Sequence, residues 1–587
     1  MFKRQIKNLI VDNFATFFTN PVNAMQRQYE AIRAIVVDQV AVEEVAKRFH
    51  YKASTVYTLL RDVKAGRVNL FPTLPRKRKT SKITDLQRRE IVKLRNMGMS
   101  AKDIHSHLLK QDINVSLRTV ERLVIELGFS KLPRRTNREL GITRKNTIVP
   151  EKAESIDFSN LKPFSIDCPV AGVFLFLPYI IESGLIDVVK KCTMPKSSVI
   201  GAEQACLSML LLKLIGGERL SHIKQYDREI GFGVFSGLSV LPKTTYMNTY
   251  SCRCSEKNLL SFQEQIISKF KKWRPDFYSS DFINLDFHSI PHFGDDSMME
   301  NVWCGSKGKT MKGANTVFAQ DSRSNVIMYS RADILRREEA LEVERFVKYW
   351  KKVNGNLNET LVFDCKFTTY EVLDELTKDK IKFITLRKRH AALLKATETV
   401  PKEKWQKIFL PIPKRKYTHV SVFEEVVRLK GCQNTFRQIT IKDHGRANPT
   451  YMILNDSKLS LQDALLVYAK RWHIEQKIAE VVSFFNMNAL SSPLMIRIHF
   501  DVFWTIIADT LYHVFASDLR RFENCTAPTI FKKFINMPGK VVFDGLNFQI
   551  KIRKRSHTPI LLGIEKLQGP ISIPWLIGRT VEIVWTA

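Results

Sequence analysis

Acidic residues are scarce in this chain. Asp and Glu number 59 against 92 Lys and Arg, so the formal net charge is +33 over 587 residues. Such an excess says little about fold, but it argues for a polyanionic partner, and nucleic acid is the first to consider. The alternative is a basic protein that only adheres to acidic surfaces.

Cysteine pairs of the zinc-binding type and long apolar runs are also missing. Of the nine cysteines only Cys252 and Cys254 lie close together, and no CxxC pair indicates a zinc site. We expect free, mostly buried thiols in a reducing compartment. The most apolar run, near VFLFLPYIIE, breaks at Pro178 and Glu182 and is too short to span a bilayer. No secretory signal opens the chain, so we expect a cytoplasmic, nucleoid-associated protein with no membrane partner.

The length predicts several domains, because single hydrophobic cores rarely exceed about 250 to 300 residues. We expect an α/β fold in which all-α DNA-binding modules precede a catalytic core. The expected segments are a helix-turn-helix module at 1–66, a basic linker at 67–82, a second helix-turn-helix module at 83–130, a second basic linker at 131–160, a helical scaffold at 161–275, the first part of the catalytic core at 276–395, a β-rich insertion at 396–461, the last core helix at 462–520 and a C-terminal region at 521–587.

Each amino-terminal module shows three short apolar stripes at helical spacing, which fits a helix-turn-helix. The third helix of the first module should begin near Ala53, and Ser116 is the expected N-cap of the last helix of the second. Short polar and basic residues at the front of such helices suit base edges and phosphates in a major groove. The alternative is a plain three-helix bundle. The candidate DNA contacts are Ser54, Thr55, Tyr57, Arg61, Arg118, Thr119 and Arg122.

The segment between the modules, FPTLPRKRKTSK, is a further candidate DNA contact. Its two prolines oppose a helix, and its run of like charges repels itself into an extended strand that can lie in a minor groove. A localisation signal or a solvated linker is the alternative. The basic residues are Arg76, Lys77, Arg78 and Lys79.

Strands and helices alternate from about Phe282. INLDFHSI predicts a strand, NTVFAQD and NVIMYSRA a hairpin, EEALEVERFVKYWKKV an amphipathic helix, TLVFDCKF a strand, YEVLDELTKD a helix and KFITLRK a strand. Three strands followed by helix, strand, helix and strand is the order of an RNase H-like core. More strands follow before the next helix, so residues 396–461 look inserted.

Two of these apolar runs end in an aspartate, Asp286 and Asp364, which lie 78 residues apart (364 − 286). The first and fourth strands should be neighbours, so the two carboxylates should be adjacent. Tyr468, Arg471 and Glu475 stand at offsets 0, +3 and +7, on one face of a helix. Three carboxylates suit two hard cations, Mg²⁺ or Mn²⁺, about 4 Å apart, which can activate a nucleophile and stabilise a leaving phosphodiester oxygen. The sequence therefore predicts metal-dependent cutting and joining of DNA.

Three other motifs are weaker candidates. Asp321 falls in the hairpin turn, where aspartate is favoured for turn geometry. His288 and His292 imitate a metal-binding pair, but Mg²⁺ avoids imidazole, and a buried, hydrogen-bonded His288 is the preferred interpretation. CGSKGKT is no P-loop, because the glycine required five positions before Gly308 is Trp303. We expect a basic loop that touches DNA instead.

The core motifs resemble those of the DDE transposases of bacterial insertion sequences, in particular the group with an inserted β domain and a Y-x2-R-x3-E-x6-K signature. The resemblance spans roughly residues 160–587 and is carried by NLDFHSIPHFGDD, AQDSRSNVIMYSRAD, VFDCKFTTYEVLDEL, IKFITLRKR and YAKRWHIEQ. It implies that the three carboxylates bind two metal ions and that Tyr468 and Arg471 contact phosphates near the cleaved end. The signature lysine is replaced by Val482, and Lys477 lies on the wrong side of the helix to substitute for it.

The resemblance implies cut-and-paste transposition of double-stranded DNA. Terminal inverted repeats would be bound, cut and joined to target DNA, with hairpin ends, by a homodimer. One alternative is a catalytically inactive, transposase-derived DNA-binding protein, which the intact triad argues against. Another is a retroviral-type integrase, but its second aspartate and its glutamate would lie much closer together than the 111 residues found here (475 − 364).

Overall fold

The structure is a computed structural model that describes residues 18, 21, 24–71, 83–129, 132, 152–294, 299–332, 334–412, 416–489, 492 and 494–587. The chain forms two compact units, Met1–Thr147 and Ile148–Ala587. The basic run at 76–79 lies outside the described residues, as does most of the second expected linker.

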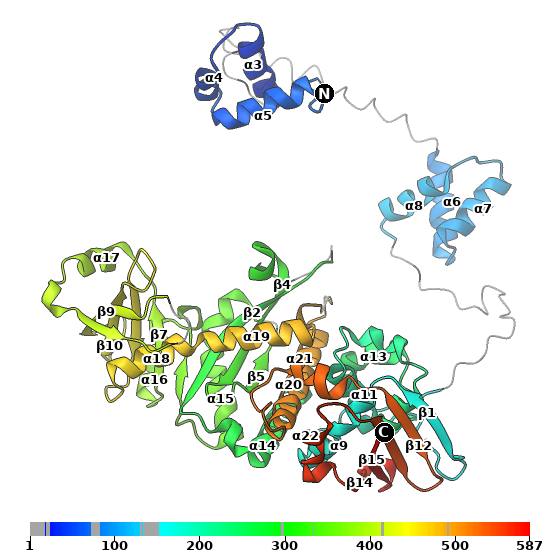
Figure 1. The fold of residues 1–587 in the computed structure, drawn as a ribbon. Helices are drawn as coiled ribbons and strands as arrows, with labels where there is room; N and C mark the ends of the chain where they lie inside the picture. The colour runs from blue at the N-terminus through cyan, green and yellow to red at the C-terminus, as the bar shows by residue number, and fades with distance from the viewer. Residues whose placement is uncertain are drawn as a thin grey trace. The chain divides into compact units, whose positions relative to one another are not determined.

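The first unit contains two groups of three helices, each with its own small core (Figure 1). Ser116 caps the last helix as expected, since its side chain accepts a hydrogen bond from the backbone N–H of Thr119. The third helix of the first group begins at Ala53, also as expected. The helices are α3 (Ala24–Val36), α4 (Val42–Arg48), α5 (Ala53–Lys64), α6 (Asp85–Asn96), α7 (Ala101–Lys110) and α8 (Leu117–Glu126).

The second unit is α/β and contains a ten-stranded mixed sheet. Its order is β3-β4-β2-β6-β7-β11-β10-β9-β8, with β5 paired to β4. Strand β2 runs antiparallel to β4 and parallel to β6, and β6 runs parallel to β7. The strands are β2 (Phe282–Pro291), β3 (Asn301–Cys304), β4 (Lys309–Asp321), β5 (Ile327–Arg331), β6 (Thr360–Val362), β7 (Phe383–Arg387), β8 (Gln406–Phe409), β9 (His419–Val427), β10 (Phe436–Lys442) and β11 (Thr450–Leu454).

The strands of the expected insertion continue this sheet. Strand β11 pairs antiparallel with β7, so β8 to β11 cover an edge that would otherwise expose unpaired backbone groups. They form a second hydrophobic cluster with α18, centred on Ile439, Met452 and Leu465. Helix α18, which follows β11, also packs against β7.

Helices cover the sheet and link it to the rest of the unit (Figure 1). Helix α19 packs on β2, α20 on β5 and α14 on α15. Helix α20 is buried along nearly its whole length, which fits the apolar residues that lie on all of its sides. These helices are α14 (Glu256–Trp273), α15 (Glu342–Asn354), α16 (Tyr370–Lys378), α17 (Ala391–Glu398), α18 (Leu461–Lys470), α19 (Trp472–Phe484) and α20 (Met495–Ser517).

A second, five-stranded sheet joins the regions 161–275 and 521–587. Its order is β1-β12-β13-β15-β14, and β1 pairs antiparallel with β12. One hydrophobic cluster extends from Ala153 to Ile583 and unites both sheets. The remaining elements are β1 (Phe164–Cys168), β12 (Gly539–Phe543), β13 (Phe548–Arg553), β14 (Pro570–Ser572), β15 (Thr580–Thr586), α9 (Leu177–Glu182), α10 (Leu185–Lys191), α11 (Ala202–Leu214), α12 (Ile230–Ser236), α13 (Thr244–Tyr250), α21 (Ala527–Ile530) and α22 (Thr558–Leu562).

Within the described residues no single helix has the length and apolarity needed to cross a membrane. One bent pair, Ala171–Glu182 with Leu185–Lys191, meets both criteria when its two parts, set at 62° to each other, are taken together. All nine cysteines are free, and six of them are buried.

Two elements differ from the sequence-based expectation. Strand β2 continues beyond Asp286 to Pro291, because β4 pairs with it along its whole length, so Asp286 lies in mid-strand. Pro291 is tolerated because β6 pairs only with the start of β2 and leaves the other edge open. The expected single helix through Tyr468 and Glu475 is divided at Arg471, where two successive i to i+3 backbone bonds tighten one turn.

Candidate active site

Asp286 and Asp364 occupy equivalent positions on neighbouring strands. The parallel pairing of β2 with β6 matches Phe282 with Thr360 and ends at Asn284 and Val362. The two aspartates lie two residues beyond that last pair on each strand, where parallel strands are about 4.8 Å apart. Asp364 follows the end of β6 and its Oδ1 accepts a hydrogen bond from the backbone N–H of Cys365. The first and fourth strands of the core are therefore neighbours, as the sequence predicted, and the two aspartates lie at the same level of the sheet.

Arg471 links Asp286 to Glu475. Its Nη1 lies 3.0 Å from Asp286 Oδ2, and its Nη2 lies 2.9 Å from Glu475 Oε1. The Arg471 and Asp286 side chains are 13% and 18% exposed, whereas Glu475 is 57% exposed. A half-buried guanidinium thus spans the space between the strand carboxylate and the helix carboxylate.

The electrostatics of the site centre on the same guanidinium. Burial raises the pKa of Asp286, and the Glu475 charge adds to this effect while Arg471 opposes it. Burial lowers the pKa of Arg471, but the surrounding negative charges, led by Asp286 and including Asp364, raise it overall. Arg471 therefore stays charged and interacts with all three predicted metal ligands.

Tyr468 and Arg471 border a cleft of about 310 Å³ beside Asp364. The Arg471 Cζ lies 5.8 Å from the centroid of the Tyr468 ring, and burial raises the pKa of Tyr468. The inserted strands supply the opposite wall, including His444 and Arg446 from the β10–β11 loop. Leu386, Ile441, Met452 and Leu465 give the cleft an apolar lining, and Asp364, Arg446 and Arg471 add charged groups to it.

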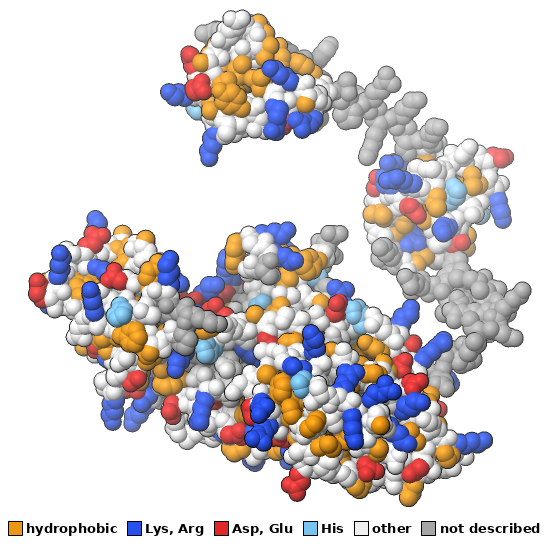
Figure 2. All heavy atoms as spheres, viewed as in Figure 1, with side chains coloured by type: hydrophobic (Ala, Val, Ile, Leu, Met, Phe, Trp, Pro, Cys, Tyr) orange, Lys and Arg blue, Asp and Glu red, His pale blue; other side chains and the backbone are white. Residues whose placement is uncertain are grey.

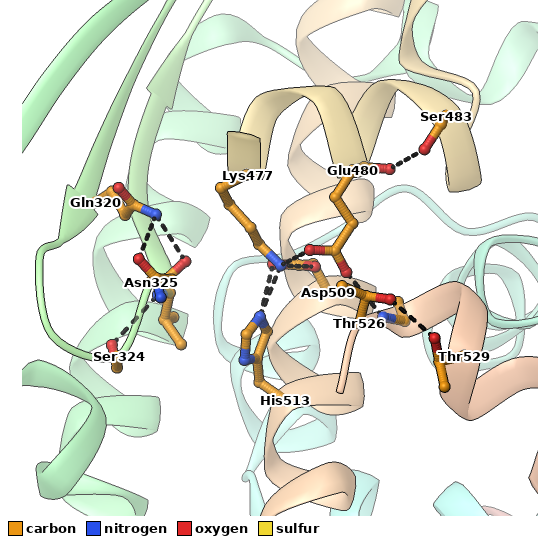
Figure 3. A network of polar contacts seen from close by, with 12 residues as sticks. Gln320, Ser324, Asn325, Lys477, Glu480, Ser483, Asp509, His513, Thr526 and Thr529 are labelled. Atoms are coloured by element: carbon orange, nitrogen blue, oxygen red, sulfur yellow. Dashed lines mark hydrogen bonds and ion pairs between the residues drawn. The ribbon is translucent and has the colours of Figure 1, made fainter. Parts of the chain in front are cut away.

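A buried ionic network fixes helix α19 behind the site (Figure 3). Lys477 Nζ lies 2.7 Å from Asp509 Oδ1 and 2.6 Å from His513 Nε2, both on α20, and 3.3 Å from Glu480 Oε2. Glu480 Oε1 in turn accepts a hydrogen bond from the backbone N–H of Ala527. Lys477 therefore points away from Glu475 and into the protein, which matches the side of the helix expected from the sequence.

The other candidate residues near the site have structural partners. Asp321 Oδ1 accepts hydrogen bonds from the backbone N–H groups of Arg323 and Ser324 and so closes the β4–β5 turn. His288 Nε2 lies 2.8 Å from Asn488 Oδ1, and burial lowers its pKa. Val482 is partly buried against the main core, so the position of the signature lysine points inward rather than toward a ligand.

The candidate DNA contacts of the first unit lie on its surface. On α5 they are all exposed: Ser54, Thr55, Tyr57 and Arg61. On α8 Arg118 and Arg122 are exposed, whereas Thr119 is half-buried and its Oγ1 lies 2.8 Å from the Oγ of Ser116. Thr119 thus takes part in capping the helix, a role that the sequence analysis did not assign.

Sequence reasoning missed Asp509 and Arg446. Asp509 stands alone in the apolar run IIADTLYHVF, and a lone carboxylate in a buried helix signals the need for a cationic partner. Arg446 lies in a loop with no chemical motif, so only the tertiary structure places it at the cleft.

The carboxylates of Asp286, Asp364 and Glu475 are suitable ligands for a divalent metal, but they do not form a cluster that could hold one in this structure. Among the described residues no group of three or more His, Cys, Asp or Glu side chains is close enough to hold a metal ion. Arg471 lies between two of the three carboxylates instead. Their oxygens are the ligands that Mg²⁺ and Mn²⁺ prefer, and the bound guanidinium indicates that the position accepts a cation. A metal would therefore fit once Arg471 releases a carboxylate.

Comparison with solved structures returns transposase complexes at low similarity. A piggyBac transposase synaptic complex with hairpin DNA is 10% identical, with a TM-score of 0.34 over 64% of this chain and 82% of that chain. A pre-cleavage Mos1 transpososome is also 10% identical, with a TM-score of 0.13 over 62% of this chain and 77% of that chain. No family model and no curated protein matches the sequence. Likenesses this weak carry no argument, so function must be inferred from the site itself.

Proposed function

We propose that this chain is a DDE-type DNA transposase of the insertion-sequence group, with an RNase H-like core interrupted by a β-rich insertion. The observation that carries the proposal is that Arg471 contacts Asp286 and Glu475 and lines one cleft together with Asp364. The strand order β5-β4-β2-β6-β7, with β2, β6 and β7 parallel, supports the proposed core.

The three carboxylates would hold two Mg²⁺ or Mn²⁺ ions, which supply activation of the nucleophile and stabilisation of the leaving oxygen. For these ions to bind, Arg471 has to release Asp286 or Glu475. Its planar guanidinium then suits the two oxygens of a DNA phosphate beside the carboxylates. Tyr468, at the edge of the same cleft, would contact the same phosphate.

The reaction proposed is two successive displacements at phosphorus. Water attacks the phosphate at the element end, the bond to the 3′ oxygen breaks, and a free 3′-hydroxyl results. That hydroxyl then attacks a phosphate of the opposite strand, which gives a hairpin, or of target DNA, and displaces another 3′ oxygen. No covalent enzyme intermediate is needed.

The partners in this proposal are terminal inverted repeats and target DNA. The helices α5 and α8 would read the repeats, with the exposed residues at their amino-terminal ends in the major groove. The formal charge of +33 supports binding to a polyanion. A homodimer would bring two element ends together.

A cleavage assay tests the proposal. Its substrates are DNA duplexes that carry the inverted repeats flanking the gene. With Mg²⁺ or Mn²⁺ the wild type should cut at the repeat end, and with EDTA it should not. Asp286→Ala, Asp364→Ala and Glu475→Ala should each abolish cutting while end binding stays nearly unchanged, because binding is spread over many basic contacts. A variant that cuts at the wild-type rate would remove its residue from the assignment.

The same experiment decides the second candidate, an inactive transposase-derived DNA-binding protein. That protein would bind the repeats without cutting them under any metal condition. The intact set of three carboxylates with Arg471 favours the active enzyme.

A further inference from the structure

A two-stranded ribbon projects from the sheet beyond the end of β2 (Figure 1). Strand β4 is 13 residues long, and only its carboxyl-terminal part, from Gly313, pairs with β2. Its amino-terminal part, Lys309 to Lys312, pairs with β3 instead. We call residues 301–312 the β3–β4 ribbon. At its base the Lys312 ammonium donates to the Met299 carbonyl at 2.7 Å, which ties the two strands together.

One face of the ribbon continues the face of the sheet that carries Asp286. Asp286 lies opposite Phe318 on β4, and side chains alternate along a strand, so Thr310, eight residues before Phe318, shares that face. Trp303 lies opposite Thr310 and lines a cavity that Phe287 and His288, the residues after Asp286 on β2, also line. At about 3.4 Å per residue, the eight residues from Phe318 to Thr310 span at most about 27 Å, so Trp303 lies within that distance of Asp286 along the strand direction.

The end of the ribbon presents aromatic and basic side chains to solvent. Trp303 is 59% exposed and the neighbouring Phe293 is 60% exposed. Lys307 Nζ lies 5.8 Å from the Phe293 ring centroid, and Lys309 is also exposed. The ribbon contains three lysines and no carboxylate. Figure 2 shows this mixture of basic and hydrophobic groups at the projecting end of the sheet.

We propose that the β3–β4 ribbon is a second DNA-binding element that holds the duplex within about eight base pairs of the cleavage position. The limit of eight base pairs is the span of about 27 Å divided by the rise of about 3.4 Å per base pair. Lys307 and Lys309 would neutralise phosphates, and the Trp303 ring would pack against the sugar or base edges in the groove, since a two-stranded ribbon fits a major groove. The inference rests on the proposed function for the position of the cleaved phosphate, but not for DNA binding itself.

Salt dependence of binding measures the lysine contacts. The probe is a 30-base-pair duplex of arbitrary sequence, bound without divalent metal and followed by fluorescence anisotropy between 50 and 200 mM salt. Each phosphate contact contributes about 0.9 to the slope of log K against log salt. The full-length Lys307→Ala/Lys309→Ala variant should lower the magnitude of that slope by about 1.8. The matched control, Lys257→Ala/Lys272→Ala on the exposed surface of α14, should leave it unchanged, and an unchanged slope in the ribbon variant would overturn the proposal.

Photocrosslinking identifies what the aromatic side chain contacts. Benzoylphenylalanine in place of Trp303 should form a protein–DNA adduct with the same duplex on irradiation, and the same replacement of exposed Ile577 should not. An adduct between two copies of the chain would identify the ribbon as a protein interface and overturn the proposal, as would the absence of any adduct. Both measurements need no cleavage. If the protein binds DNA through the ribbon but never cuts it, the proposed enzymatic function is refuted, whereas the proposal that the ribbon binds DNA stands.

Discussion

Arg471 balances the charge of the candidate site at the scale of one residue. Its two Nη atoms contact Asp286 and Glu475, so one side chain neutralises two carboxylates that would otherwise repel each other. A lysine could not do this with two separate, fixed donors, because its ammonium is a single point of charge. The planar, two-donor geometry of the Arg471 guanidinium is therefore the feature to test.

Arg471→Lys should slow strand cleavage more than it weakens binding. The expected loss is about 1 to 3 kcal/mol in the activation free energy, the range of a hydrogen bond to a charged group. Single-turnover cleavage on pre-bound DNA measures it directly. If Arg471 were only an ion-pair partner of the exposed Glu475, the effect would be about 1 kcal/mol or less. An unchanged rate would leave Arg471 without a part in catalysis.

His499 and His513 on α20 should make stability depend on pH. Burial lowers the pKa of His499 to about 4 and that of His513 to about 3, the latter with help from the Lys477 charge. The unfolded chain takes up protons near pH 6.5 while the folded chain does not, so stability is fully present above pH 6.5 and falls as the pH drops toward 4. Each histidine contributes up to about 1.4 kcal/mol per pH unit in that window.

Urea unfolding at pH 7, 6 and 5 measures this dependence. His499→Leu should remove one proton from the linkage and make the decline shallower by up to about 1.4 kcal/mol per pH unit. The control His419→Leu changes an exposed histidine and should keep the wild-type decline. Equal declines in His499→Leu and wild type would mean that His499 is protonated in the folded protein.

At the scale of elements, helix α19 is held in register by an ionic contact rather than by apolar packing alone. Lys477 and Asp509 are both buried, and their 2.7 Å contact joins α19 to α20. Burial raises the pKa of Asp509, and Lys477 opposes the rise. Glu475 precedes Lys477 by two residues on α19, which packs on β2. The Lys477–Asp509 contact therefore helps to fix the position of Glu475.

Removing only one member of this pair should be costly. Lys477→Met leaves Asp509 as a buried charge without its main partner, and we expect a loss of about 3 to 5 kcal/mol in unfolding free energy. The double variant Lys477→Met/Asp509→Leu should recover most of that loss, since apolar residues of similar volume can replace a buried pair. Denaturant unfolding of the three proteins tests this. Additive losses in the double variant would show that the two residues do not act as a pair.

The sequence predicts local elements well and distant contacts poorly. The aspartate pair was foreseeable because Asp286 lies within one β-rich run and Asp364 follows another, and the order of the strands makes the two runs neighbours. The Arg471–Glu475 contact follows from helical spacing, since residues four apart share a face. The contact of Arg471 with Asp286, 185 positions earlier in the chain, depends on how α19 packs on β2 and leaves no local signal.

Elements that the sequence separates are joined in the folded protein at the scale of the whole molecule. The β1–β12 pairing brings Phe164 opposite Phe543, so the region around 161–275 cannot be complete without the C-terminal strands. No local sequence pattern predicts this pairing, because each strand taken alone is only a short apolar run. One cluster from Ala153 to Ile583 then joins both sheets of the second unit.

This organisation predicts that the second unit folds without the first. Its core begins at Ala153, whereas the helices of Met1–Thr147 have small cores of their own, so removing residues 1–147 should leave the thermal unfolding of the remainder unchanged. The truncated protein should still bind duplex DNA weakly and with strong salt dependence, through its basic surface. It should no longer distinguish terminal repeat from scrambled duplex at moderate salt, whereas the full chain should prefer the repeat by about 10³-fold or more. Competition binding with the two duplexes measures the ratio for both proteins. Discrimination retained after truncation would place sequence reading in the second unit and leave α5 and α8 as structural helices only.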